Sequence, residues 1–361
     1  MAKSEFDLLA ELSSAPGPSG FEDSIRSIVQ RELGPLVRTL ETDGIGSVIA
    51  KLDCDKEHPR LMLSAHMDEV GLMVRYITEE GFLKFQTLGG WLDQALINQR
   101  WNIMTERGLV KGITGIKTPH VMPPEDRSNL FKKGDMFIDV GATSKKDAEE
   151  RLKIKPGDAI APDSRFERLN GGDILLGKAW DDRIGLAVMI EVIKNLKDVT
   201  LDSTVFCVAT VQEEIGLRGA YTSTYNVAPD IGINLESGVA GDYPGTSMDE
   251  AQEKIGHGPA IFLHDSSMLP NLRLKDFVVE TARSEGIPLQ FNVLNGYGQD
   301  GAEIQRSRGG RPSINITVPT RYLHSHNSLV SKHDFDNAVM LITALIKRID
   351  EKTVKYLKAF D

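Results

Sequence analysis

The chain has 361 residues, of which 40% are hydrophobic and 26% are charged, and its formal net charge is −10. This length exceeds the size at which one hydrophobic core usually stops growing, so we expect two domains. The acidic balance argues against a nucleic-acid partner, and no run approaches the ~18 apolar residues of a membrane span.

Helical and strand patterns alternate through the first 69 residues and again from residue 164 onward. The expected helices lie at 4–12, 22–33, 183–196, 271–285 and 334–357. The expected strands lie at 47–52, 60–65, 204–211, 230–235, 290–294 and 313–318. Such alternation with short apolar strands predicts an α/β fold whose central, mostly parallel sheet is sandwiched by helices.

The stretch from 70 to 163 has a different texture. Short alternating strands, separated by turns, are expected at 72–76, 83–87, 101–104, 108–115 and 135–140. The only long helical pattern there comes late, at 145–152. We therefore predict a small β-rich barrel inserted into a catalytic domain that is built from residues 1–69 and 164–361.

Cysteine content and the N-terminus bear on the compartment. Cys54 and Cys207 are too few for a disulfide framework or a thiolate metal site. Cys207 lies inside an apolar run and is expected to be a buried, small hydrophobic residue. The first residues lack the apolar stretch of a signal peptide, so we expect a cytoplasmic protein.

Five motifs bearing acidic or histidine side chains follow or end apolar runs. They are His66-x-Asp68-Glu69-x-Gly71, Trp180-Asp181-Asp182-Arg183-x-Gly185, Glu213-Glu214-x-Gly216, Asn234-Leu235-Glu236 and Arg321-Tyr322-x-His324-Ser325. In open α/β sheets, ligands bind outside the carboxyl ends of the strands, so these motifs are expected to converge at one edge. Imidazoles and carboxylates without thiolates are the ligand chemistry of a two-metal hydrolytic site.

Each motif also has a structural interpretation. Adjacent acids are common on solvated surfaces, and a single histidine at the end of an apolar run is more often a hydrogen-bonded core residue than a ligand. His326 lies close to His324, and position alone does not distinguish them. Glu236 is also compatible with a strand end facing water. Taken together at strand ends, the motifs favour a metal site.

These motifs resemble the signatures of the tetrahedral aminopeptidase family, over essentially the whole chain. Its members, also called glutamyl aminopeptidases and sometimes endoglucanases, are cytosolic dinuclear metallo-aminopeptidases. The resemblance implies a fold of the co-catalytic zinc-peptidase type, with an inserted barrel domain that mediates dimerisation. It also implies peptide substrates and assembly into dimers or tetrahedral dodecamers.

The resemblance implies a role for each motif. Two divalent ions, zinc foremost and cobalt or manganese as alternatives, are expected to be bridged by one carboxylate, with two further ligands on each ion. Asp181 is the implied bridge between the ions. His66 and Glu236 are the implied further ligands of one ion, and Glu214 and His324 are those of the other. Glu213 is implied as the general base that activates a metal-bridging water. Asp68 is implied to orient His66 through its second ring nitrogen.

Two positions depart from the family pattern. The family usually carries Asp where this chain has Glu236, and often Pro where it has His326. Because the first change bears on end-specificity, a metal-dependent peptidase or deacylase that reads a different end is an alternative. A glycoside hydrolase is another, although Glu213 and Glu214 are too close in sequence to straddle a sugar and the histidines would lack a role. The sequence therefore predicts an aminopeptidase that removes N-terminal residues from peptides.

Overall fold

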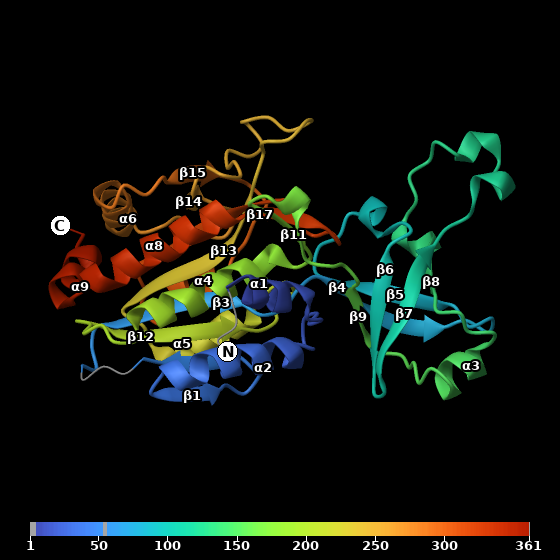
Figure 1. The fold of residues 1–361 in the computed structure, drawn as a ribbon, viewed down its shortest axis with the longest axis horizontal. Helices are drawn as coiled ribbons and strands as arrows, with labels where there is room; N and C mark the ends of the chain where they lie inside the picture. Colours follow the sequence, from blue (N-terminus) through green and yellow to red (C-terminus); the bar gives the residue numbers. More distant parts are fainter. Residues whose placement is uncertain (1–4, 53–55, 361) are drawn as a thin grey trace.

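The computed structural model describes residues 5–52 and 56–360, so Cys54 lies outside the described part. Figure 1 shows two bodies along the long axis of the molecule, a large sheet flanked by helices and a smaller barrel. The barrel strands lie between Gly71 and Pro162, and the sheet is formed by the segments before and after them. The chain therefore enters the barrel after the sheet strand that ends at His66 and leaves it before the sheet strand that begins at Glu167.

The large sheet is mixed. Its main path runs in the order β1-β2-β12-β3-β13-β16-β17-β11-β10, with β14 pairing β15 and β16 beside it. The strands are β1 (Thr39–Thr42), β2 (Val48–Lys51), β3 (Arg60–His66), β10 (Glu167–Arg168), β11 (Ile174–Gly177), β12 (Thr204–Thr210), β13 (Ile231–Val239), β14 (Ala260–His264), β15 (Gln290–Val293), β16 (Ser313–Arg321) and β17 (Ser328–Ser331). The four central strands, β12, β3, β13 and β16, are parallel, whereas the strands along both edges of the path pair antiparallel.

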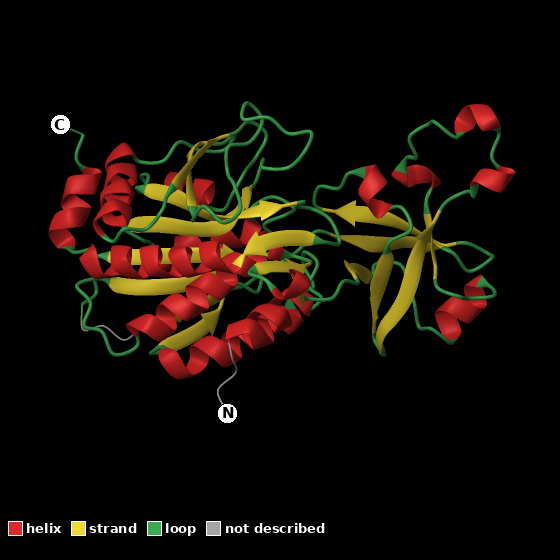
Figure 2. Ribbon diagram, turned by 45° about the horizontal axis from the view of Figure 1, so that its top comes forward, coloured by secondary structure: helices red, strands yellow, loops and turns green. Residues whose placement is uncertain are grey.

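Helices cover both faces of this sheet, as Figure 2 shows. They are α1 (Glu5–Ser14), α2 (Asp23–Leu33), α4 (Trp180–Leu196), α5 (Arg218–Val227), α6 (Leu272–Ser284), α7 (Gly301–Arg306), α8 (Lys332–Arg348) and α9 (Glu351–Lys358). Helices α4 and α8 pack on one face over the main hydrophobic core, while α5 and α7 pack on the other face. Cys207 is fully buried in that core, which confirms the expectation for it.

The smaller body is a closed antiparallel barrel with the strand order β4-β5-β8-β7-β6-β9. Its strands are β4 (Gly71–Ile77), β5 (Leu83–Leu88), β6 (Arg100–Thr105), β7 (Gly108–Gly115), β8 (Phe137–Asp139) and β9 (Ala159–Pro162), and its helix is α3 (Lys145–Glu150). Alternate inward-facing residues form a separate core around the fully buried Trp101. An α/β sheet with an inserted barrel is thus confirmed as the fold.

Two helices differ by three residues or more from their expected bounds. Helix α4 begins at Trp180, three residues early, although Asp181 and Asp182 have non-helical backbone angles. The expected C-terminal helix is two helices, because Asp350 accepts a hydrogen bond from the Thr353 N–H and begins α9 as its N-cap.

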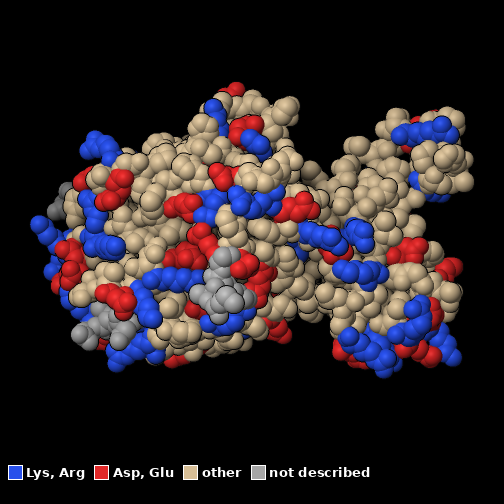
Figure 3. Space-filling view, viewed as in Figure 1, with Lys and Arg blue, Asp and Glu red and all other residues tan. Residues whose placement is uncertain are grey.

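Among the described residues, no helix is long and apolar enough to cross a membrane. On the face drawn in Figure 3, basic and acidic side chains are interspersed over both bodies.

Candidate metal centre

The parallel centre of the sheet brings the predicted motifs to one edge. β3 ends at His66, Glu213 and Glu214 follow β12, and Glu236 lies on β13. His324 lies three residues beyond the end of β16, and its backbone adopts a left-handed conformation with φ 52°. Because parallel strands all present their carboxyl ends on the same side, side chains far apart in sequence meet in space.

Asp181 lies between the two histidines. Its Oδ1 is 3.0 Å from Nε2 of His66, and its Oδ2 is 3.3 Å from Nε2 of His324. Burial alone would raise the pKa of Asp181, but its contacts with His324 and His66 outweigh burial and lower it. One carboxylate thus presents its two oxygens to two different imidazoles, which is the geometry of a group that bridges two cations.

Each histidine has a second carboxylate nearby. Oε1 of Glu236 is 3.4 Å from Nε2 of His66, and Oε2 of Glu214 is 3.5 Å from Nε2 of His324. The other oxygens of the two glutamates, Glu236 Oε2 and Glu214 Oε1, are buried without a hydrogen-bond partner among the described residues. Buried carboxylate oxygens need a partner, so this donor set of imidazole nitrogens and unpaired oxygens fits divalent cations.

The extra methylene of Glu236, relative to the aspartate expected from the family, has a visible consequence. Its carboxylate folds back along β13, and Oε1 accepts a hydrogen bond of 3.1 Å from the N–H of Ser237. The longer side chain therefore reaches His66 while remaining fixed to its own strand.

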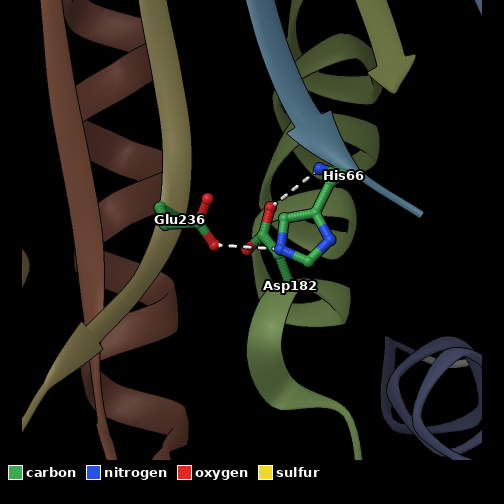
Figure 4. A group of neighbouring side chains, drawn as sticks. All are labelled: His66, Asp182 and Glu236. Atoms are coloured by element: carbon green, nitrogen blue, oxygen red, sulfur yellow. Dashed lines mark hydrogen bonds and ion pairs between the residues drawn. The ribbon is translucent and has the colours of Figure 1, made fainter. Parts of the chain in front are cut away.

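Asp182 joins this cluster as well. One potential ligand atom from each of His66, Asp182 and Glu236 lies within 4.8 Å of the other two. Figure 4 shows these three side chains. A second such group is formed by His66, Asp181 and Glu214. The Asp182 carboxylate accepts the N–H groups of His66 at 3.1 Å and of Gly185 at 3.0 Å. Because both its oxygens are engaged by the main chain, Asp182 fastens the end of β3 to α4.

Asp68 contacts the second ring nitrogen of His66 and also holds the neighbouring main chain. Nδ1 of His66 lies 3.0 Å from the main-chain carbonyl oxygen of Asp68 and 3.5 Å from its carboxylate. The fully buried carboxylate also accepts the N–H groups of Glu213 at 2.9 Å and Glu214 at 3.2 Å, and the hydroxyl of Ser19 at 2.6 Å. Asp68 thus fixes the main chain that carries both glutamates.

Glu213 is the acidic residue set back from the cluster. Its nearest contact with a histidine is 3.9 Å, from Oε2 to Nε2 of His66, and its side chain is about nine-tenths buried. Burial raises the pKa of Glu213 well above its usual value, and the carboxylates of Glu236 and Glu214 raise it further. Burial, followed by repulsion from Asp181, raises the pKa of Glu214 to about 8 and that of Glu236 to about 7. Carboxylates with raised pKa values in one cluster are typical of catalytic sites.

His326 stands apart from these residues. Its Nε2 contacts the carbonyl oxygen of Arg100 at 2.9 Å, and its ring packs edge-on against Trp101 with centroids 4.3 Å apart. Burial lowers the pKa of His326 to about 4, so it is a neutral packing residue between the barrel and the sheet. The contacts favour His324 as the ligand of the two.

Sequence reasoning gave no role to Asp300. Asp300 is fully buried, and its Oδ2 accepts a 2.5 Å hydrogen bond from the hydroxyl of Thr210 at the end of β12. Its Oδ1 has no partner among the described residues, and burial raises its pKa to about 6. The available signal was its place immediately before α7.

An α/β sheet with carboxylates and imidazoles gathered at its parallel strand ends is typical of metal-dependent hydrolases. Comparison with known proteins narrows the class. Residues 46–341 match the M42 glutamyl aminopeptidase family. The chain is 36% identical to the putative aminopeptidase FrvX of Escherichia coli over 355 residues, which cover 98% of each protein.

Solved structures agree. A TET aminopeptidase from the marine sediment archaeon Thaumarchaeota archaeon SCGC AB-539-E09 superposes with a TM-score of 0.96 at 43% identity, covering 98% of this chain and 99% of that one. The TET1 peptidase of Pyrococcus horikoshii, described as assembling into a tetrahedron or a large octahedral shell, has a TM-score of 0.87 at 32% identity, covering 96% of this chain and all of that one. This chain belongs to the M42 glutamyl aminopeptidase family. It is therefore a metal-dependent aminopeptidase that hydrolyses N-terminal peptide bonds.

Proposed function

We propose that the chain binds two divalent ions, zinc foremost, and removes N-terminal residues from peptides with Glu213 as the general base. The position of Asp181 carries the proposal, since its two oxygens face His66 and His324 at 3.0 and 3.3 Å. Asp181 would bridge the ions, with one further glutamate completing each pair of ligands. These are Glu236 beside His66 and Glu214 beside His324.

The bound ions would supply Lewis-acid chemistry, polarising the scissile carbonyl and lowering the pKa of a water toward ~7. Glu213 is suited to take the proton of that water and return it to the leaving amine, because it lies beside the cluster, 3.9 Å from Nε2 of His66, and burial raises its pKa above the usual value. Asp68 holds the Glu213 N–H at 2.9 Å and so sets the position of the base. The surplus of buried carboxylates also favours the ammonium group of a free N-terminus.

We also propose that residues 70–163 act as an assembly domain of a cytoplasmic homo-oligomer, a dimer or a tetrahedral dodecamer. The TET1 peptidase of Pyrococcus horikoshii supports the proposal through its described assembly. Leu92, Val121 and Leu130 support it as well, because these apolar side chains of the inserted segment are 66–76% exposed.

The test uses purified protein and short peptides with free, N-acetylated and C-amidated ends. Release of the first residue from free N-termini only, abolished by chelation and restored by zinc or cobalt, is expected. Cleavage that requires a free C-terminus instead would mean that Glu236 has changed the end that is read.

The Glu213→Gln variant assigns the base. We expect turnover to fall roughly 10²–10⁴-fold while both ions are retained. Glu214→Gln is the matched neighbour and should lose metal as well as activity. If Glu213→Gln loses as much metal as Glu214→Gln does, the roles of base and ligand are exchanged.

A further inference from the structure

Strand β13 extends past its neighbour β3, and this leaves part of its edge open beside the metal centre. Pairing between them ends at Asn234 and Ser64. The N–H groups of Gly232 and Ala240 bond to the β16 side, at 3.0 and 3.1 Å. Because main-chain groups alternate along a parallel strand, odd-numbered residues of β13 face the opposite side. The carbonyl of Ser237 therefore points to the space beyond the end of β3.

Tyr297 covers this open edge. Its hydroxyl donates a 3.1 Å hydrogen bond to the carbonyl oxygen of Ser237. Its ring stacks on Phe262, with centroids 5.5 Å apart and an interplanar angle of 7°. Its own carbonyl accepts both the N–H and the hydroxyl of Ser266, at 3.0 and 2.6 Å, so the loop that carries it is fastened.

The hydroxyl of Tyr297 bonds to Ser237, which is the residue next to Glu236 of the proposed metal centre. Ser237, which accepts the phenol, also donates its N–H to Glu236, and the same Glu236 oxygen is 3.4 Å from His66. Burial, followed by the nearby carboxylates of Asp181 and Glu236, raises the pKa of Tyr297 above its usual value. The phenol therefore stays neutral at physiological pH.

The ring of Tyr297 packs in an apolar cluster. Phe262 and Leu294 are buried beside it, and Val239 packs on the same cluster. Arg321 is held by Asp242 through two bonds of 2.7 and 2.6 Å, so its charge is already neutralised. A carboxylate side chain of a substrate would thus meet a neutral aromatic wall in a site rich in carboxylates.

We infer that Tyr297 is a specificity-determining residue whose ring forms the wall against which the side chain of the substrate's first residue packs. This inference rests on the proposed metal centre, because that centre fixes where the first residue lies. The wall favours aromatic and aliphatic first residues over acidic ones. The chain would then differ in preference from the glutamyl activity by which its family is described.

The experiment compares kcat and KM of the zinc-loaded enzyme on aminoacyl-coumarin amides of Phe, Leu, Ala and Glu. The wild-type enzyme should prefer Phe and Leu to Glu by at least about 10-fold in kcat/KM. Tyr297→Ala should lower the Phe-to-Ala ratio of kcat/KM about 10- to 100-fold, mostly through KM. Tyr297→Phe keeps the ring and should retain most of that ratio.

Tyr225→Ala is the matched control, because Tyr225 lies on α5 with 66% of its surface exposed and its ring stacks on Arg308. It should leave all four substrates unchanged, and metal content is measured for every variant. A wild-type preference for Glu, or an equal loss on all substrates in Tyr297→Ala, overturns the inference. A different result would contradict the proposed function itself. In that case the wild-type enzyme would cleave after chelation, or would cleave substrates that lack a free amine.

Discussion

Replacing Asp68 by Asn tests whether this buried carboxylate positions the catalytic main chain. The carboxylate accepts three hydrogen bonds, from the N–H groups of Glu213 and Glu214 and from the hydroxyl of Ser19. The pKa of Asp68 is lowered, because contacts with His66 and Ser19 outweigh the effect of burial. The ionised form is therefore the one that the fold stabilises.

The cost follows from counting acceptors. An amide of the same shape keeps the bond to the Glu213 N–H through its oxygen, and the Ser19 hydroxyl can turn to accept from the new NH₂ group. The Glu214 N–H then faces a donor and loses its partner, at about 1–3 kcal/mol. Loss of the charge weakens the remaining bonds by roughly 1 kcal/mol each. We expect a total loss of about 3–5 kcal/mol in the free energy of unfolding.

Stability and turnover should fall together in this variant. Ser19→Ala, which removes only one of the three bonds, is the matched control and should cost about 1.5 kcal/mol. Denaturant unfolding of the metal-free and zinc-loaded protein measures stability, and kcat should fall about 10²-fold as Glu213 shifts. Unchanged kcat and an unchanged unfolding midpoint in Asp68→Asn would refute the assignment.

Three further changes test other parts of the structure. Asp181→Asn should lower the number of bound ions per subunit, because a neutral amide bridges cations poorly; retention of both ions, measured by elemental analysis, would remove Asp181 from the bridge. Lys178→Met should cost about 3–5 kcal/mol in denaturant unfolding, since it removes the cation 2.7 Å from the buried Glu69 and leaves that carboxylate with the Gly17 N–H at 3.0 Å and the more distant Arg183 at 3.7 Å; a cost below about 1 kcal/mol would contradict this. Burial raises the pKa of Glu253 to about 8 from 4.5, so its stabilising effect is complete below pH 4.5 and is lost as pH rises to about 8. Glu253→Gln should therefore lose less stability than the wild type between pH 5 and pH 9, and parallel pH profiles would show that Glu253 is not the cause.

The parts of the fold that sequence could predict are those set by short-range patterns. Apolar runs located the four central strands, and the residues directly after them were expected at one edge of the sheet. The break between α8 and α9 was missed because Ile349 continues the apolar period, although Asp350 caps the following helix. A single capping hydrogen bond can interrupt a periodic pattern, but the sequence does not show whether that bond forms.

Side-chain roles were less predictable, because they depend on contacts between distant segments. Asp181 and Asp182 are adjacent acids at the start of α4, and only the non-helical backbone there turns one toward both histidines and the other toward the β3 main chain. The bond from Tyr297 to Ser237 joins residues 60 positions apart. No local spacing in the sequence encodes either arrangement.

The concentration of carboxylates at this sheet edge is itself an argument about chemistry. Asp181, Glu213, Glu214, Glu236 and Asp300 are buried around two histidines, and several of their oxygens have no hydrogen-bond partner among the described residues. Burying that many acidic groups opposes folding unless positive charge or protons compensate them. Backbone bonds tie down Asp68 and Asp182, whereas Glu214 and Glu236 each keep a free oxygen. The acids bound by the main chain thus maintain the shape of the site, and the unpaired oxygens of Glu214 and Glu236 support the proposal that these two side chains bind cations.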